Sequence, residues 1–162
     1  MMKKILSFAL IFGLLSFFVS SCSDDNDLPN VDYQIKVSGG VIDENTGEIY
    51  VVRGTTFTID ELTVTNVDSD KEAAITYAEY YWDYYFLGQS PLPPFTYNIA
   101  VTDEAKLGKH VLSIRTGIVA VDKEPAVGLI TYTVVVVESE EDLPDNGSQT
   151  SVTTVKPGTK AL

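Results

Sequence analysis

The fold is decided by residues 109–137, which read KHVLSIRTGIVAVDKEPAVGLITYTVVVV. Near the start, Leu112 and Ile114 alternate with Ser113 and Arg115, and near the end apolar residues at even positions alternate with threonines. Successive side chains of a β-strand point to opposite faces, so this alternation predicts two strands that each place one face in a core. The charged residues and proline between them are typical of a turn.

The same pattern continues outward through most of the chain. Five earlier segments are rich in strand-forming residues and end in turn residues: Tyr33–Ser38, Ile49–Val52, Thr55–Val67, Ile75–Phe86 and Phe95–Val101. Within 55–67 the apolar positions change phase near Asp60, which predicts a β-bulge there. Because no helical period is sustained, these runs predict an all-β sandwich of about seven strands.

The composition excludes several classes of function. Hydrophobic residues make up 44% and charged residues 21% of the 162 residues, as in ordinary globular domains. Eleven basic and 23 acidic residues give a net charge of −12, which argues against nucleic-acid binding because phosphates require a basic surface. The single cysteine excludes an intrachain disulfide, and the single histidine provides few ligands for a histidine-based metal site.

The N-terminal segment has the layout of a secretory signal. Two lysines precede an uncharged apolar run over 5–19, which is shorter than a membrane-spanning helix requires. Val19-Ser20-Ser21-Cys22 follows directly and resembles the lipobox of bacterial lipoproteins, in which the cysteine is acylated and becomes the mature N-terminus. The resemblance implies a cleaved signal peptide over 1–21 and lipid, palmitate included, on Cys22. A plain secretory signal with an incidental cysteine is the alternative.

The residues after the cysteine are acidic. The run Ser23-Asp24-Asp25-Asn26-Asp27 resembles the export signal of surface lipoproteins in the Bacteroidetes, which implies lipid anchoring on the outer face of the outer membrane. The periplasmic face of that membrane is the alternative. The same composition fits a solvated acidic tether over 22–31.

A further resemblance lies in the body of the chain. Its motifs are AEYYWD at 78–83, LGQS at 87–90, Pro94-Phe95 and LGKHVL at 107–112, within residues 76–137. Together they resemble bacterial immunoglobulin-like domains, with a departure at Tyr84, where that family often has glycine in a turn. The resemblance implies an immunoglobulin-like β-sandwich over 32–138, used for spacing, adhesion or carbohydrate association, and no catalytic residues. Residues 139–162, acidic and then rich in serine and threonine, are predicted to form a disordered tail, with weak strand pairing of Ser151–Val155 as the alternative.

Aromatic residues offer the candidate binding surface. Six of the seven residues 80–86 are aromatic, and strand alternation places Trp82 in the core with Ala78 and Tyr80. The aromatic side chains at odd positions point to the opposite face of the sheet and are exposed. Exposed aromatic rings are suited to stacking on sugars or packing on a protein. The residues predicted to form this ladder are Tyr77, Tyr81 and Tyr85. In the alternative, these tyrosines merely cover the sheet.

Groups suited to chemistry are scarce. His110 has no obvious partner, so a structural or surface role is predicted for it rather than that of a base or ligand. The acidic turns at 43–45 and 68–70 carry oxygen ligands that suit calcium, but neither has the spacing of an EF-hand loop. Glu79 and Asp83 lie about 13 Å apart on an extended strand, too far for a glycosidase pair. We therefore expect neither an enzyme nor a cofactor.

Three functions fit these observations. The favoured one is a non-catalytic, membrane-anchored cell-surface lipoprotein whose immunoglobulin-like domain serves binding or adhesion. The second is a glycan-binding accessory lipoprotein of a polysaccharide-uptake system, and the third is a structural subunit of an envelope or fimbrial assembly. The expected partners are the membrane, through lipid on Cys22, and a glycan or an envelope protein.

Overall fold

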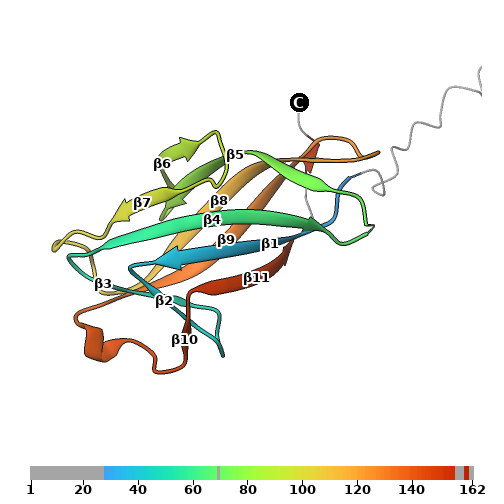
Figure 1. The fold of residues 1–162 in the computed structure, drawn as a ribbon. Helices are drawn as coiled ribbons and strands as arrows, with labels where there is room; N and C mark the ends of the chain where they lie inside the picture. The colour runs from blue at the N-terminus through green and yellow to red at the C-terminus, as the bar shows by residue number, and fades with distance from the viewer. Residues whose placement is uncertain (1–27, 69, 156–158, 161–162) are drawn as a thin grey trace, which may run out of the picture.

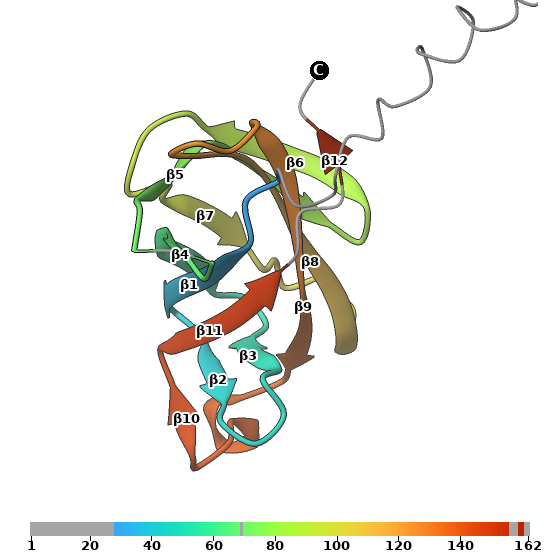
Figure 2. The same ribbon diagram turned by 90° about the vertical axis from the view of Figure 1, so that its right-hand side faces the viewer.

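The structure is a computed structural model that describes residues 28–68, 70–155 and 159–160. It consists of two β-sheets packed face to face, as Figures 1 and 2 show in two views. The smaller sheet has the strand order β11 (Thr150–Val155), β1 (Val31–Ser38), β4 (Thr56–Asn66) and β7 (Tyr97–Ala100). Among the described residues, no helix is long and apolar enough to cross a membrane.

The larger sheet contains the two strands of the deciding stretch at its centre. Its order is β10 (Gly147–Ser148), β2 (Val41–Asp43), β3 (Ile49–Val52), β9 (Ala126–Val137), β8 (Gly108–Ala120), β5 (Ala73–Trp82) and β6 (Tyr85–Ser90), while β12 (Thr159–Lys160) also pairs with β9. Strand β3 runs parallel to β9, and every other pairing is antiparallel. The predicted immunoglobulin-like β-sandwich is confirmed, with short strands added to the predicted set.

The predicted bulge lies where the sequence changes phase. In the pairing of β1 with β4, Lys36 lies opposite Glu61, but the next residue, Val37, lies opposite Ile59. Asp60 is therefore the extra residue, and it lets β4 keep its apolar residues in the core on both sides of the break.

The C-terminal residues depart from the prediction. A disordered tail is wrong for 147–150, and over 151–155 the alternative of strand pairing holds, because β10 pairs with β2 and β11 pairs with β1 over six residues. A short 3₁₀ helix, η2 (Glu140–Asp142), lies between β9 and β10 of the larger sheet, and the chain crosses to the smaller sheet between β10 and β11 (Figure 1). Pairing with β11 satisfies backbone groups of β1 that would otherwise lie on a sheet edge, and the β-branched composition of 150–155 favours a strand.

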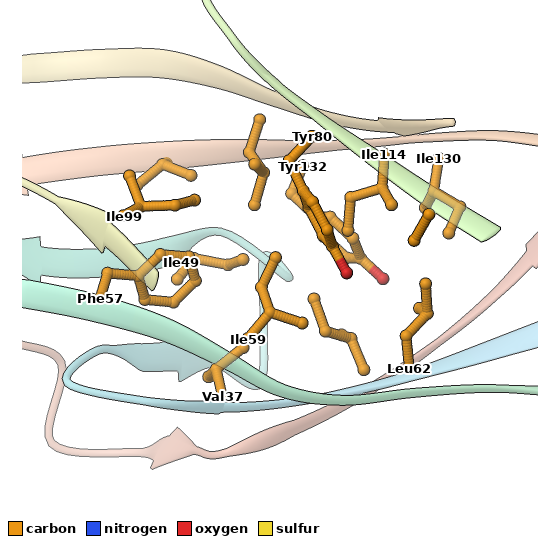
Figure 3. Packing of buried hydrophobic residues seen from close by; sticks show 14 of the residues in the cluster. Val37, Ile49, Phe57, Ile59, Leu62, Tyr80, Ile99, Ile114, Ile130 and Tyr132 are labelled. Carbon is orange, nitrogen blue, oxygen red and sulfur yellow. The ribbon is translucent and has the colours of Figure 1, made fainter. Parts of the chain in front are cut away.

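Side chains from both sheets meet in one hydrophobic core. Figure 3 shows Phe57 and Ile59 of the smaller sheet facing Ile49, Ile114 and other residues of the larger sheet. All four are fully buried, as the alternation of their strands requires. The core strands therefore follow the predicted inward faces.

Three tyrosines, Tyr33, Tyr80 and Tyr132, carry hydroxyl groups into this core. The Tyr33 hydroxyl of β1 hydrogen-bonds the Thr116 hydroxyl of β8, so it joins the two sheets. Burial raises the pKa of Tyr33 to about 12, and the group stays neutral at physiological pH. A Cβ at Gly128 of β9 would lie 2.1 Å from the Tyr33 oxygen, so the space at Gly128 admits the hydroxyl.

Tyr80 of β5 makes the second buried connection. Its ring stacks on Tyr97 of β7 with centroids 4.5 Å apart, and its hydroxyl donates to the carbonyl of Phe95. Tyr80 and Ala78 are fully buried as predicted, but Trp82 is only half-buried and packs on the imidazole of His110, 5.2 Å away between centroids. Tyr80, rather than Trp82, is therefore the aromatic anchor of this strand.

The different burial of Tyr80 and Trp82 predicts different losses of stability when each side chain is replaced by alanine. Tyr80→Ala removes a fully buried ring and should lower the free energy of unfolding by about 3–5 kcal/mol. Trp82→Ala removes a half-buried ring and should lower it by about 1–2 kcal/mol. Urea unfolding measures both, and equal losses would contradict the ranking of the two anchors.

Candidate functional site

The hairpin that joins β5 to β6 exposes aromatic rings at a strained turn. Its two turn residues, Asp83 and Tyr84, have φ angles of 47° and 71°. Two consecutive positive φ values define a type I′ turn, in which asparagine and glycine are favoured. Tyr84 instead has a bulky side chain that is 83% exposed. Neither core packing nor backbone preference explains a tyrosine at this position, and strain of this kind is concentrated at functional sites.

The turn also rearranges the predicted aromatic ladder. Trp82 lies opposite Tyr85, and Tyr81 lies opposite Phe86. Directly opposed residues of antiparallel strands share a face, so Tyr85 lies on the Trp82 side and does not continue the ladder of Tyr77 and Tyr81. Phe86 takes that place, with its ring centroid 5.4 Å from that of Tyr81. The structure thus brings together two of the three predicted residues.

Exposed apolar side chains are concentrated along this hairpin and the loop that follows it. Half of the ten large exposed hydrophobic residues in the described part of the chain fall within 84–92: Tyr84, Tyr85, Phe86, Leu87 and Leu92. In addition, no residue from 84 to 102 is charged, although 21% of the chain is. Uncharged, aromatic-rich surface of this kind marks interaction sites on soluble domains.

An acidic side chain fixes the turn to the neighbouring strand. The Asp83 carboxylate accepts the backbone N–H of Val111 at 2.9 Å and contacts His110 Nδ1 at 2.7 Å. The backbone N–H of Asp83 also donates to the Val111 carbonyl at 2.8 Å. The other ring nitrogen of His110, Nε2, lies 2.8 Å from the carbonyl of Lys106. This set of contacts, the Asp83–His110 clamp, joins the turn, β8 and the loop before β8.

The clamp requires a charged histidine. A carboxylate and a carbonyl only accept hydrogen bonds, so both ring nitrogens of His110 must donate. Partial burial opposes the charge, but the hydrogen bonds to Asp83 and Lys106 outweigh it and raise the pKa of His110 above 6.5. Burial likewise acts against the charge of Asp83, yet its bonds to His110 and Val111 lower its pKa below 3.8. The prediction that His110 lacks a partner is therefore wrong, while its role is structural.

The outer face of the large sheet carries the rest of the predicted ladder. Tyr77 and Tyr81 are half-buried there, and Tyr77 lies over Gly117 of β8, where a Cβ would come within 2.5 Å of its ring. The Tyr81 hydroxyl donates to Glu79 at 3.0 Å, and Arg115 binds the same carboxylate oxygen at 2.9 Å. An ion pair thus lies between two aromatic rings on one face.

The acidic turn at 43–45 has hydrogen-bonding partners within the chain. The Asp43 carboxylate accepts the N–H groups of Asn45 and Thr46 at 2.7 and 3.3 Å, as in an Asx turn. Within the described residues, no three His, Cys, Asp or Glu side chains are grouped so as to hold a metal ion. Residues 1–21, Cys22 and the acidic run after it lie outside the described residues.

Comparisons with known proteins add a likeness to solved structures. No protein-family model matches the chain, and no curated protein matches it. Among solved structures, the chain is similar to the fibronectin(III)-like modules of Clostridium thermocellum CbhA, at 18% sequence identity and a TM-score of 0.36. That match covers 65% of this chain and 99% of the other.

The clamp predicts a pH dependence with a definite sign. Because the pKa of His110 is raised by folding, its stabilisation is complete below pH 6.5 and is lost as the pH rises through the folded-state value. Because the pKa of Asp83 is lowered, its contribution is complete above pH 3.8 and is lost as the pH falls. The clamp therefore stabilises the fold most between these two values.

His110 is the only histidine, so its NMR titration can be followed without overlap. We expect a pKa above 6.5 in the wild type and a lower pKa in Asp83→Asn. Wild-type stability in urea should fall from about pH 6 to about pH 9 by more than that of His110→Gln, which does not titrate. A wild-type pKa at or below 6.5 would contradict the clamp.

Proposed function

We propose that this chain is a non-catalytic, lipid-anchored surface protein whose immunoglobulin-like domain binds or adheres through the β5–β6 hairpin. The observation that carries the proposal is Tyr84, an exposed aromatic residue in a backbone conformation that favours glycine. Tyr85 and Phe86 extend the exposed aromatic surface from it. Aromatic side chains are the commonest anchors of binding surfaces because they bury much area with few rotatable bonds.

The support of the hairpin suits it to binding. Asp83 holds the turn through its side chain and its backbone, and the half-buried Trp82 packs on the imidazole of the same clamp. A rigid support lowers the entropy lost when exposed side chains become ordered in a complex. The rings therefore lie on a preorganised turn.

The lipobox-like segment supports the anchoring half of the proposal. Acylation of Cys22 would hold the domain at the outer membrane, and the acidic residues after it support display on the outer face. More than one acyl chain is needed for stable attachment, since a single myristoyl chain binds a bilayer only marginally. The tether would then present the hairpin to molecules outside the cell.

A glycan is the second candidate ligand, and the outer sheet face favours it. Tyr77, Tyr81 and Phe86 supply flat apolar surface, and the Glu79–Arg115 pair supplies hydrogen-bonding groups between the rings. Sugars present apolar faces with hydroxyl groups at their edges, so this combination fits them. On this proposal the chain is an accessory lipoprotein of polysaccharide uptake.

Matched variants separate the two surfaces. Tyr84→Gly with Tyr85→Ser removes the rings at the turn, and Tyr77→Ser with Tyr81→Ser removes those of the outer face. The turn variant should weaken binding of the purified protein to intact cells by about tenfold or more, while the outer-face variant should reduce signals on a glycan array only if a sugar binds there.

The turn variant also has an internal control for folding. Glycine suits the left-handed conformation of residue 84, so Tyr84→Gly alone should leave the free energy of unfolding unchanged or slightly raised. Unchanged cell binding by both double variants, with the fold retained, would exclude the aromatic surfaces and the proposed role.

The anchor is tested separately. Cys22→Ala should abolish acylation, so the protein should leave the outer-membrane fraction or be mislocalised. Membrane fractionation with metabolic labelling by a fatty acid measures both effects. A variant that stays as firmly bound as the wild type would overturn the lipoprotein proposal.

A further inference from the structure

Strand β6 ends the larger sheet with an open edge. On one side it pairs with β5, and in the described part of the chain no strand lies on its other side. The backbone groups of an open edge are a template for another strand, and proteins usually guard such edges with charged residues. Strand β6 has none, and Leu87 and Gln89 are exposed along it.

The absence of charge extends from β6 to the neighbouring end strand of the smaller sheet. Strand β7 ends the smaller sheet, and it adjoins β6 through the Tyr80–Tyr97 stack and the approach of the Tyr97 hydroxyl to Gly88. Both strands fall within the uncharged residues 84–102 of a chain whose net charge is −12. Most other contacts between two copies would bring acidic residues together, and those contacts would be repulsive.

We propose that a second copy of this chain pairs with it through β6, antiparallel and about a twofold axis. A twofold contact sets the same surface against itself, so the uncharged edge meets an uncharged edge. The pairing joins the two larger sheets into one continuous sheet and satisfies the outer backbone groups of β6. The inference goes beyond the proposed binding role, because it concerns the outer backbone edge of β6 along Leu87 and Gln89, whereas the proposed binding surface is formed by the aromatic rings of Tyr84, Tyr85 and Phe86.

Sedimentation velocity of the full chain, in enough detergent to leave at most one protein per micelle, tests this pairing. We expect the wild type to shift from monomer to dimer as its concentration rises, and Leu87→Lys with Gln89→Lys to weaken the dimer at least tenfold. This variant reduces the net charge from −12 to −10, so it lowers the general repulsion between copies. A weaker dimer must then arise from charge placed at the edge itself.

Leu129→Lys is the matched control, because Leu129 is an apolar residue of β9 that is 57% exposed and lies away from β6 in the sheet order. It should dimerise like the wild type. Hydrogen exchange of the wild type needs no substitution, and the β6 amides should become more protected as concentration rises. A wild type that stays monomeric at all concentrations, or a dimer that only Leu129→Lys disrupts, would overturn the proposal.

Discussion

The position of the Tyr80 ring is the constraint on which the rest of this side of the molecule depends. The ring stacks on Tyr97 of the opposite sheet, and its hydroxyl binds the carbonyl of Phe95. A buried hydroxyl that lost this partner would destabilise the fold. This hydrogen bond therefore fixes the position of β7 relative to β5, in addition to the apolar packing between the two strands. Tyr97 in turn reaches Gly88, where a side chain would clash, and this contact sets how closely β6 lies to β7.

The exposed aromatic turn stands on this anchored strand. Tyr80 is buried two residues before Trp82, and the clamp made by Asp83 and His110 begins immediately after it. From Tyr80 to Tyr84 the aromatic side chains therefore change from buried, through the half-buried Trp82, to exposed. The exposed Tyr84 is therefore held by a rigid strand whose preceding residues are packed and hydrogen-bonded. Binding surfaces are most effective when they are supported in this way.

Much of the fold follows from residue alternation, and the site follows from it only in part. Period-two patterns located the core faces, and the phase change predicted the bulge at Asp60 because a slip would have exposed Leu62. The same parity argument failed for Tyr85, because the chain reverses in a two-residue turn. After the turn Tyr85 lies opposite Trp82 and shares its face, although Tyr81 and Tyr85 are both at odd positions. Local patterns also carry no information on contacts between distant residues, which is why the pairing of His110 with Asp83 was missed.

Covalent footprinting on intact cells tests the central claim, that the aromatic turn is the bound surface, most directly. Hydroxyl-radical labelling of Tyr84 and Tyr85 is compared between the protein on cells and the purified protein, with the exposed Leu129 as the internal reference. The account predicts that both tyrosines are protected on cells by several-fold relative to Leu129. Equal labelling of the tyrosines in the two states would contradict it.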